Sequence, residues 1–118
     1  MSLAVRLGGA GGQGIVLAGL VLAEAAASCG RRVACTQAYG PESRGGACRS
    51  DVIISEEPIA FPAARQLDVL VALTQAACDR FWAALAPGGV VIVDDGRVAP
   101  PSTESRCHAL PIIETARS

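Results

Sequence analysis

The chain has 118 residues, of which 51% are hydrophobic and 18% are charged, and its formal net charge is −1. This composition excludes a disordered chain and predicts one folded domain with a modest core. The near-zero charge gives no basis for a nucleic-acid or anionic-membrane surface, so neither is expected as a partner. The chain has no lysine, because all ten residues counted as Lys or Arg are Arg. This excludes a Schiff-base lysine and the lysine of a phosphate-binding P-loop.

The cysteines show no metal-site spacing. They are Cys29, Cys35, Cys48, Cys78 and Cys107. None belongs to a C-x-x-C pair, and the single histidine, His108, has no second ligand at metal spacing. We therefore expect reduced, mostly buried thiols, with no metal site and no iron–sulfur cluster within this chain. The absence of a secretory signal and of an apolar run of about 18 residues predicts a cytoplasmic protein.

The first half of the chain predicts a strand, a glycine turn, a helix and two further strands. Residues 3–7 form a strand that leads into the turn. Residues 15–28 are apolar nearly all round, as in a helix packed on a sheet, and Gly30 stands at its C-terminal cap. Residues 32–38 and 50–55 are short strands, and the stretch "YGPESRGG" between them has the composition of a loop.

The second half continues the alternation of strands and helices. We expect a buried strand over 68–73, a helix over 75–86 ended by Pro87-Gly88-Gly89, strands over 90–93 and 107–110, and the start of a helix over 112–118. This alternation predicts one three-layer α/β/α domain over residues 1–118, with a largely parallel or mixed sheet.

The glycine turn "GGAGGQG" resembles the G-x-G-x-x-G pattern of Rossmann-like folds and lies between a strand and a helix. Such a turn exposes backbone N–H groups, and the helix dipole favours an anion. A dinucleotide site also needs an acidic residue about 20 positions later, where this chain has Thr-Gln-Ala. A structural tight turn and an anion or phosphate site of another kind both stay open. The candidate binding residues are Gly9, Gly11, Gly12, Gln13 and Gly14.

The loop "YGPESRGG" places Tyr, Glu and Arg between glycines at the end of a strand, where ligands and partners dock in α/β sheets. The fork of Arg44 suits a phosphate or a partner carboxylate near residues 11–14, and Glu42 can orient it. The alternative is an ordinary turn with a weak surface ion pair. The candidate binding residues are Tyr39, Gly40, Pro41, Glu42, Arg44, Gly45 and Gly46.

Three segments resemble a known family in order and spacing. They are "GGAGGQGIVLAG", "QAYGPESRGGACRSDVIISEEPI" and "DVLVALTQAACDRF". From about Val5 to Ala116 the chain resembles the gamma-subunit domain of 2-oxoacid:ferredoxin (acceptor) oxidoreductases. "SEEPI" and "VALTQ" are most similar to the 2-oxoglutarate type. Members of this family generally run longer, so the chain resembles a gamma-type domain that lacks its C-terminal part.

The resemblance implies a domain that accompanies alpha and beta subunits. Those partners bind thiamine diphosphate, and a separate subunit or domain carries iron–sulfur clusters. The assembly decarboxylates a 2-oxoacid, passes electrons to ferredoxin or a ferredoxin-like subunit, and delivers the acyl group to coenzyme A. The gamma domain contributes to assembly and to the coenzyme A side, without catalytic residues of its own. The alternatives are a non-catalytic scaffold subunit and, more distantly, a nucleotide-binding Rossmann-like reductase.

Overall fold

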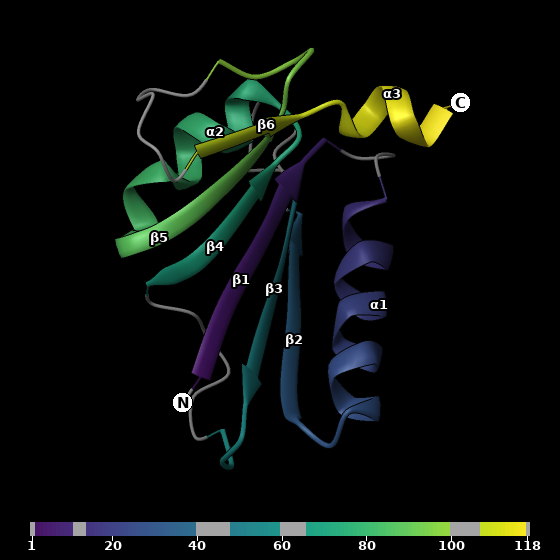
Figure 1. Cartoon of the computed structure of the whole chain (residues 1–118), viewed down its shortest axis with the longest axis vertical. Helices are drawn as coiled ribbons and strands as arrows, with labels where there is room; N and C mark the ends of the chain where they lie inside the picture. Colours follow the sequence, from purple (N-terminus) through teal and green to yellow (C-terminus); the bar gives the residue numbers. More distant parts are fainter. Residues whose placement is uncertain (1, 11–13, 40–47, 60–65, 100–106, 118) are drawn as a thin grey trace.

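The computed structural model describes residues 2–10, 14–39, 48–59, 66–99 and 107–117. Six strands in these residues form one sheet in the order β2-β3-β1-β4-β5-β6 (Figure 1). The strands are β1 (Ser2–Gly9), β2 (Arg32–Tyr39), β3 (Cys48–Ser55), β4 (Leu67–Ala72), β5 (Leu85–Asp94) and β6 (Cys107–Leu110). The helices are α1 (Ile15–Ser28), α2 (Gln75–Phe81) with the 3-10 turn Trp82–Ala84, and α3 (Ile112–Arg117).

The sheet is mixed. Strands β1, β4, β5 and β6 run parallel to one another, whereas β3 runs antiparallel to both of its neighbours, β1 and β2. As a result β1, β2, β4, β5 and β6 all end, and β3 begins, at the same edge of the sheet. We call this edge the carboxyl edge. The mixed sheet confirms the expected α/β class.

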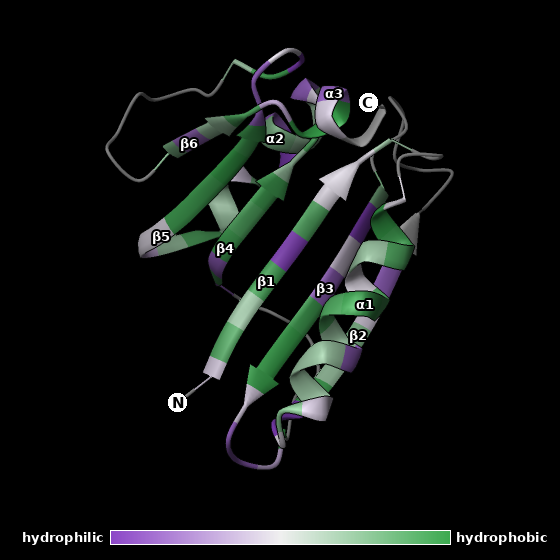
Figure 2. Ribbon diagram, turned by 45° about the vertical axis from the view of Figure 1, so that its right-hand side comes forward, coloured by the Kyte–Doolittle hydropathy of each residue, from purple (hydrophilic) through white to green (hydrophobic). Residues whose placement is uncertain are grey.

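Helices α1 and α2 lie on opposite faces of the sheet (Figure 2). A Cβ added to Gly19 of α1 would lie 1.9 Å from Ser50 Oγ on β3. A Cβ added to Gly8 of β1 would lie 2.9 Å from the Phe81 ring of α2. Ser50 is opposite Leu7, the neighbour of Gly8. Because successive strand residues point to opposite faces, α1 and α2 must cover different faces.

The main core lies between the sheet and α2. Its fully buried strand residues alternate with less buried neighbours along β4 and β5, as expected where one face is packed more tightly. The core consists of Leu67, Leu70, Ala72, Ala77, Cys78, Phe81, Val91, Val93 and Val98. None of the described helices combines the length and apolarity needed to cross a membrane.

A buried ion pair joins the neighbouring strands β1 and β3 on this side of the sheet. Arg6 of β1 is directly opposite Asp51 of β3. Its Nε and Nη2 donate to the Asp51 oxygens Oδ1 and Oδ2 at 2.7 and 3.0 Å. The two residues are only 6% and 4% exposed, and the guanidinium carbon lies 4.9 Å from the centroid of the Phe81 ring. A one-residue slip of β1 against β3 would separate these buried charges, so the pair fixes the register.

Two expected boundaries are wrong, and both lie around Pro87-Gly88-Gly89. The helix expected over 75–86 ends at Phe81, and β5 begins at Leu85. Pro87 has no N–H for a helical hydrogen bond and disfavours a helical residue before it. The Pro-Gly-Gly stretch instead forms an irregularity within β5. Leu85 is opposite Leu67 and Val90 is opposite Val69, so β5 advances by five residues where β4 advances by two. The strand expected over 90–93 begins five residues earlier, at Leu85, and the remaining expected elements are confirmed with ends shifted by two residues or fewer.

We expect Asp51→Asn to lower the free energy of unfolding by about 3–5 kcal/mol, because Arg6 would remain buried without a counter-charge. Urea unfolding measures this change. The control is Glu56→Gln, which removes the partner of Arg31 from a pair whose side chains are 57% and 46% exposed. That substitution should change stability little. Similar effects of the two substitutions would contradict the role assigned to the buried pair.

Candidate functional site

The register of three strands brings the ends of the two candidate motifs together at the carboxyl edge. Gly9, at the end of β1, is opposite Cys48, at the start of β3. Cys48 is also opposite Tyr39, at the end of β2. The strand end that leads into the glycine turn therefore lies beside the two strand ends that flank the loop. Outside the described residues are Gly11, Gly12, Gln13, Gly40, Pro41, Glu42, Arg44, Gly45 and Gly46.

Gly14 is the N-cap of α1 and adopts the left-handed conformation, with φ 77° and ψ 21°. An L-residue would be strained there by about 1–2 kcal/mol, which explains a glycine at this position. Gly14 has no side chain that could cap the helix, and no acidic residue lies in its first turn. The Gly14 carbonyl accepts the first helical hydrogen bond from the Ala18 N–H at 2.8 Å. The expected placement of the glycine motif between a strand and a helix is confirmed.

An apolar cluster lies beneath this part of the edge and anchors both motifs. Its buried members are Ile15 of α1, Cys48 of β3 and Leu73 after β4. The Leu73 N–H donates to the Gly8 carbonyl at 2.9 Å, which ties the end of β4 to the end of β1. Partly buried residues around the cluster are Leu7, Val16, Val71, Ile112 and Ile113. The cluster thus connects α1, β3, β4 and α3 at a single point.

The buried thiols of the domain serve packing. Burial raises the pKa of Cys48, so its thiol stays neutral at physiological pH and is a poor nucleophile. Burial, followed by the charge of Asp79 and by Cys107, raises the pKa of Cys78 to about 11. Burial also raises the pKa of Cys107. Of the five thiols, those of Cys48 and Cys78 are buried, those of Cys35 and Cys107 are partly buried and that of Cys29 is exposed, so fewer are buried than expected.

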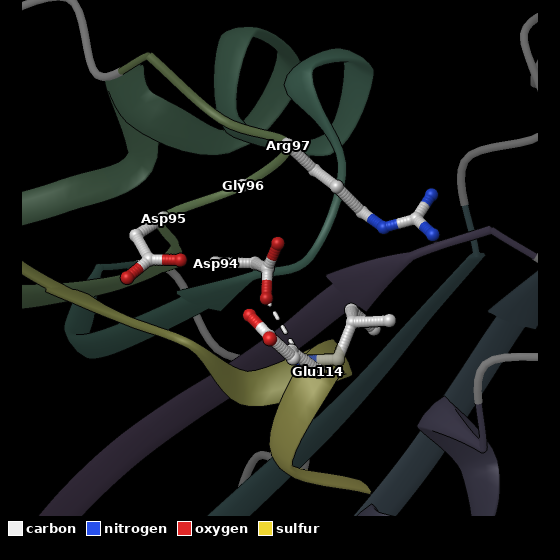
Figure 3. A pocket seen from close by; sticks show the side chains of 6 residues that line it. Asp94, Asp95, Gly96, Arg97 and Glu114 are labelled. Carbon is white, nitrogen blue, oxygen red and sulfur yellow. Dashed lines mark hydrogen bonds between the residues drawn. The ribbon is translucent and has the colours of Figure 1, made fainter. Parts of the chain in front are cut away.

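A cleft of about 340 Å³ opens farther along the same edge, after β5 (Figure 3). Asp94 is 2% exposed, and its Oδ1 accepts a hydrogen bond from the Ile113 N–H at 2.8 Å, so it caps the first turn of α3. The exposed Arg97 side chain extends away from Asp95 and Glu114. The cleft is lined by Asp94, Asp95, Gly96, Arg97, Ile113 and Glu114.

Gln75, from the "VALTQ" segment, fastens the chain after β5 to the start of α2. Its Nε2 donates to the Ala99 carbonyl at 2.8 Å, and its Oε1 accepts from the Ala99 N–H at 2.6 Å. The same Nε2 donates to Asp79 Oδ1 at 2.9 Å. Thr74 caps the helix by accepting from the Ala77 N–H at 3.1 Å. Together these bonds hold the turn that carries the cleft residues.

Asp94 and Gln75 are not among the site residues predicted from the sequence. The available signal for Asp94 is the "DDG" stretch directly after a buried strand, which places a carboxylate at the carboxyl edge. The signal for Thr74 and Gln75 is a Thr in front of a helical segment, a common N-cap. Neither signal identifies the remote backbone groups that these side chains bind.

We expect Asp94→Ala to lower the free energy of unfolding by about 0.5–2 kcal/mol, as for the loss of other helix caps. Amide hydrogen exchange in α3 should accelerate, because Ile113 N–H loses its acceptor. Asp95→Ala is the matched control, since this neighbouring carboxylate is exposed. It should leave both quantities unchanged, and equal behaviour of the two variants would argue against the cap.

The chain is similar to proteins of one family over nearly its whole length. It is 45% identical over 116 residues to the 2-oxoglutarate synthase subunit KorC of Methanocaldococcus jannaschii. The aligned region covers 95% of this chain and 62% of KorC. It is 44% identical, with a TM-score of 0.87, to the crystal structure of the keto/oxoacid ferredoxin oxidoreductase gamma subunit from Geobacter sulfurreducens PCA. That match covers all of this chain, 100%, and 65% of the Geobacter chain.

A third similarity is to the 2-oxoglutarate:ferredoxin oxidoreductase from Magnetococcus marinus, whose structure holds 2-oxoglutarate, coenzyme A and succinyl-CoA. The identity is 26% and the TM-score 0.82, over 98% of this chain and 21% of that one. The chain spans less than two thirds of the length of KorC and of the Geobacter subunit. Residues 4–118 match the family described as pyruvate ferredoxin/flavodoxin oxidoreductase, and the chain belongs to that family.

Proposed function

We propose that this chain is the gamma-type domain of a 2-oxoacid:ferredoxin oxidoreductase of the 2-oxoglutarate type, where it supports assembly and the coenzyme A side. The observation that carries the proposal is the 45% identity to KorC, a 2-oxoglutarate synthase subunit, over 116 residues. The likeness to the Geobacter gamma subunit supports the same role. The assembled enzyme would convert a 2-oxoacid to its acyl-CoA and carbon dioxide and pass the electrons to ferredoxin.

The division of labour follows from the family resemblance and from the chemistry of this chain. Alpha and beta partner subunits would bind thiamine diphosphate, and a ferredoxin-like subunit or domain would hold the iron–sulfur clusters. Where the structure describes the chain, its buried thiols have raised pKa values. Such thiols favour packing over catalysis. This chain would therefore contribute a binding surface, and its partner subunits would carry out the catalysis.

The binding surface that we assign to it is the part of the carboxyl edge where the two motifs converge. Gly9, Cys48 and Tyr39 lie in register across β1, β3 and β2, which supports joint action of the glycine turn and the loop. In this role the turn residues 11–14 supply backbone N–H groups, as helix N-termini do for phosphates. In the same role the guanidinium group of Arg44 donates two parallel hydrogen bonds to a coenzyme A phosphate or to a carboxylate of a partner subunit.

The test reconstitutes the chain with alpha and beta subunits of the 2-oxoglutarate type and measures viologen reduction that depends on 2-oxoglutarate and coenzyme A. We expect activity only when this chain is present. In the assembled complex, Arg44→Ala should raise the apparent KM for coenzyme A by about 30-fold or more, or prevent assembly, because a buried anion would lose its partner.

The matched control is Arg31→Ala. Arg31 pairs with the exposed Glu56 at the opposite edge of the sheet, so its loss should leave the KM for coenzyme A unchanged. If the complex needs this chain but Arg44→Ala leaves coenzyme A kinetics unchanged, the chain is a scaffold and the coenzyme A role is wrong. Full activity without the chain would overturn the whole proposal.

A further inference from the structure

Strand β2 is an end strand of the sheet, and within the described part of the chain no strand pairs with its outer edge. It pairs with β3 in one unbroken register over all eight residues, from Arg32 to Tyr39. The strand contains no proline and no bulge, and Arg32, at its first position, is its only charged residue. Long, regular edge strands that lack such protection pair readily with another strand. The outer edge of β2 is therefore a candidate interaction surface.

Apolar side chains of α1 are exposed beside this edge. Helix α1 lies over β2 and β3 and forms the same flank of the molecule as β2 (Figures 1 and 2). Leu17, Leu20 and Val21 are 66%, 46% and 57% exposed. Glu24 is the only charged residue of the helix. Adjacent exposed apolar side chains of this kind mark an interaction surface.

The helical turn directs Leu20 past the outer edge of β2. Gly19 faces the sheet, because a Cβ added there would lie 1.9 Å from Ser50 Oγ. Leu20 is one residue farther along, so its side chain points about 100° away from that direction, along the plane of the sheet. Helix α1 runs back from the carboxyl edge within a right-handed crossover from β1 to β2, so this step turns toward β2. Val21, about 200° from Gly19, points away from the sheet instead.

We propose that a second copy of this chain occupies this flank, with β2 paired antiparallel to β2 so that the two sheets become one. The two-fold axis of such a pair is perpendicular to the sheet, so both copies of α1 lie on the same face and run antiparallel. With strands about 4.8 Å apart, a helix between β2 and β3 lies about 5 Å from the axis. The two helices then lie about 10 Å apart, the distance at which helices pack directly.

The level of the two-fold axis makes the contact self-complementary. The middle of β2 lies between Cys35 and Thr36, and a Cβ added to Gly19 would lie 3.8 Å from Cys35 Sγ. Leu20 is therefore close to the axis and meets its own counterpart in the second copy. An extended peptide of another protein would cover the outer edge of β2 but would leave Leu20 exposed. A second copy covers both surfaces, and this favours it as the occupant.

The surface is large enough for a stable dimer. Eight strand residues measure about 26 Å, and the sheet and helix layers together are about 20 Å thick. A footprint of this size buries about 500 Å² on each copy and about 1,000 Å² in total, the size at which specific interfaces begin. Glu24 is four residues from Leu20, so the two Glu24 carboxylates are separated by about 12 Å along the helices and repel each other little.

The dimer turns the two carboxyl edges in opposite directions, because the two-fold axis reverses the direction of every strand. Each carboxyl edge would then face its own set of partner subunits. The inference does not depend on the proposed role in coenzyme A binding.

Sedimentation velocity of the purified chain over a range of concentrations tests the dimer. We expect a reversible equilibrium between monomer and dimer. Leu20→Glu should raise the dimer dissociation constant about tenfold or more, because the axis would bring two carboxylates together in an apolar contact. The matched control is Val21→Glu, the same kind of change on the next residue of the helix, which should leave the constant unchanged.

A second variant keeps the test independent of folding. Ala27 is exposed and lies eight residues after Gly19, about 80° around the helix, on the same side of α1 as Leu20. If circular dichroism shows that Leu20→Glu does not fold, Ala27→Glu should raise the dissociation constant in its place.

Amide exchange measured by NMR locates the strand contact. Every second N–H of β2 points to its outer edge, so these amides should exchange more slowly as the protein concentration rises. Amides of β6, the end strand on the other side of the sheet, should not change. A chain that stays monomeric at all concentrations, equal weakening by Leu20→Glu and Val21→Glu, or protection of β6 in place of β2 would each overturn the proposal.

Discussion

The buried pair between Arg6 and Asp51 is the constraint on which the carboxyl edge depends. It sets β1 against β3, and three residues farther along the same register Gly9 meets Cys48. Strand β2 pairs with the other edge of β3 and places Tyr39 opposite Cys48. A slip of one residue would bury both charges without partners and would turn every side chain of the slipped strand to the opposite face. The two motifs would then no longer end side by side.

The fold therefore presents two surfaces of different chemistry. At the carboxyl edge the end of β1, the end of β2, the start of β3 and the N-terminus of α1 lie together, and they rest on the apolar cluster around Ile15 and Leu73. This surface suits an anion or a charged partner group. The face of β4 and β5 that points away from α2 carries the half-buried Val69, Val71, Val90 and Ile92, and it suits packing.

Much of this was predictable from the sequence, because the elements have strong local signals. The glycine turn, α1 and the buried strand β4 follow from composition and apolar runs, and the resemblance of three ordered segments identified the family. The ion pair has a weaker signal, namely one charge in each of two apolar strands, and sequence alone does not give the register that joins them. The end of α2 was misplaced because Pro87-Gly88-Gly89 is typical of a turn between elements, whereas here it interrupts β5. The cap from Asp94 to Ile113 joins groups that only the tertiary fold brings together.

The central claim is that the glycine turn and the loop act together at the carboxyl edge. Hydrogen–deuterium exchange of the assembled complex, with and without coenzyme A, tests it most directly. The account predicts that coenzyme A slows exchange in peptides covering residues 8–14 and in peptides covering residues 39–48. Peptides at the opposite edge, residues 29–33, should be unaffected. Protection of only one of the two motifs, or of neither, would contradict the account.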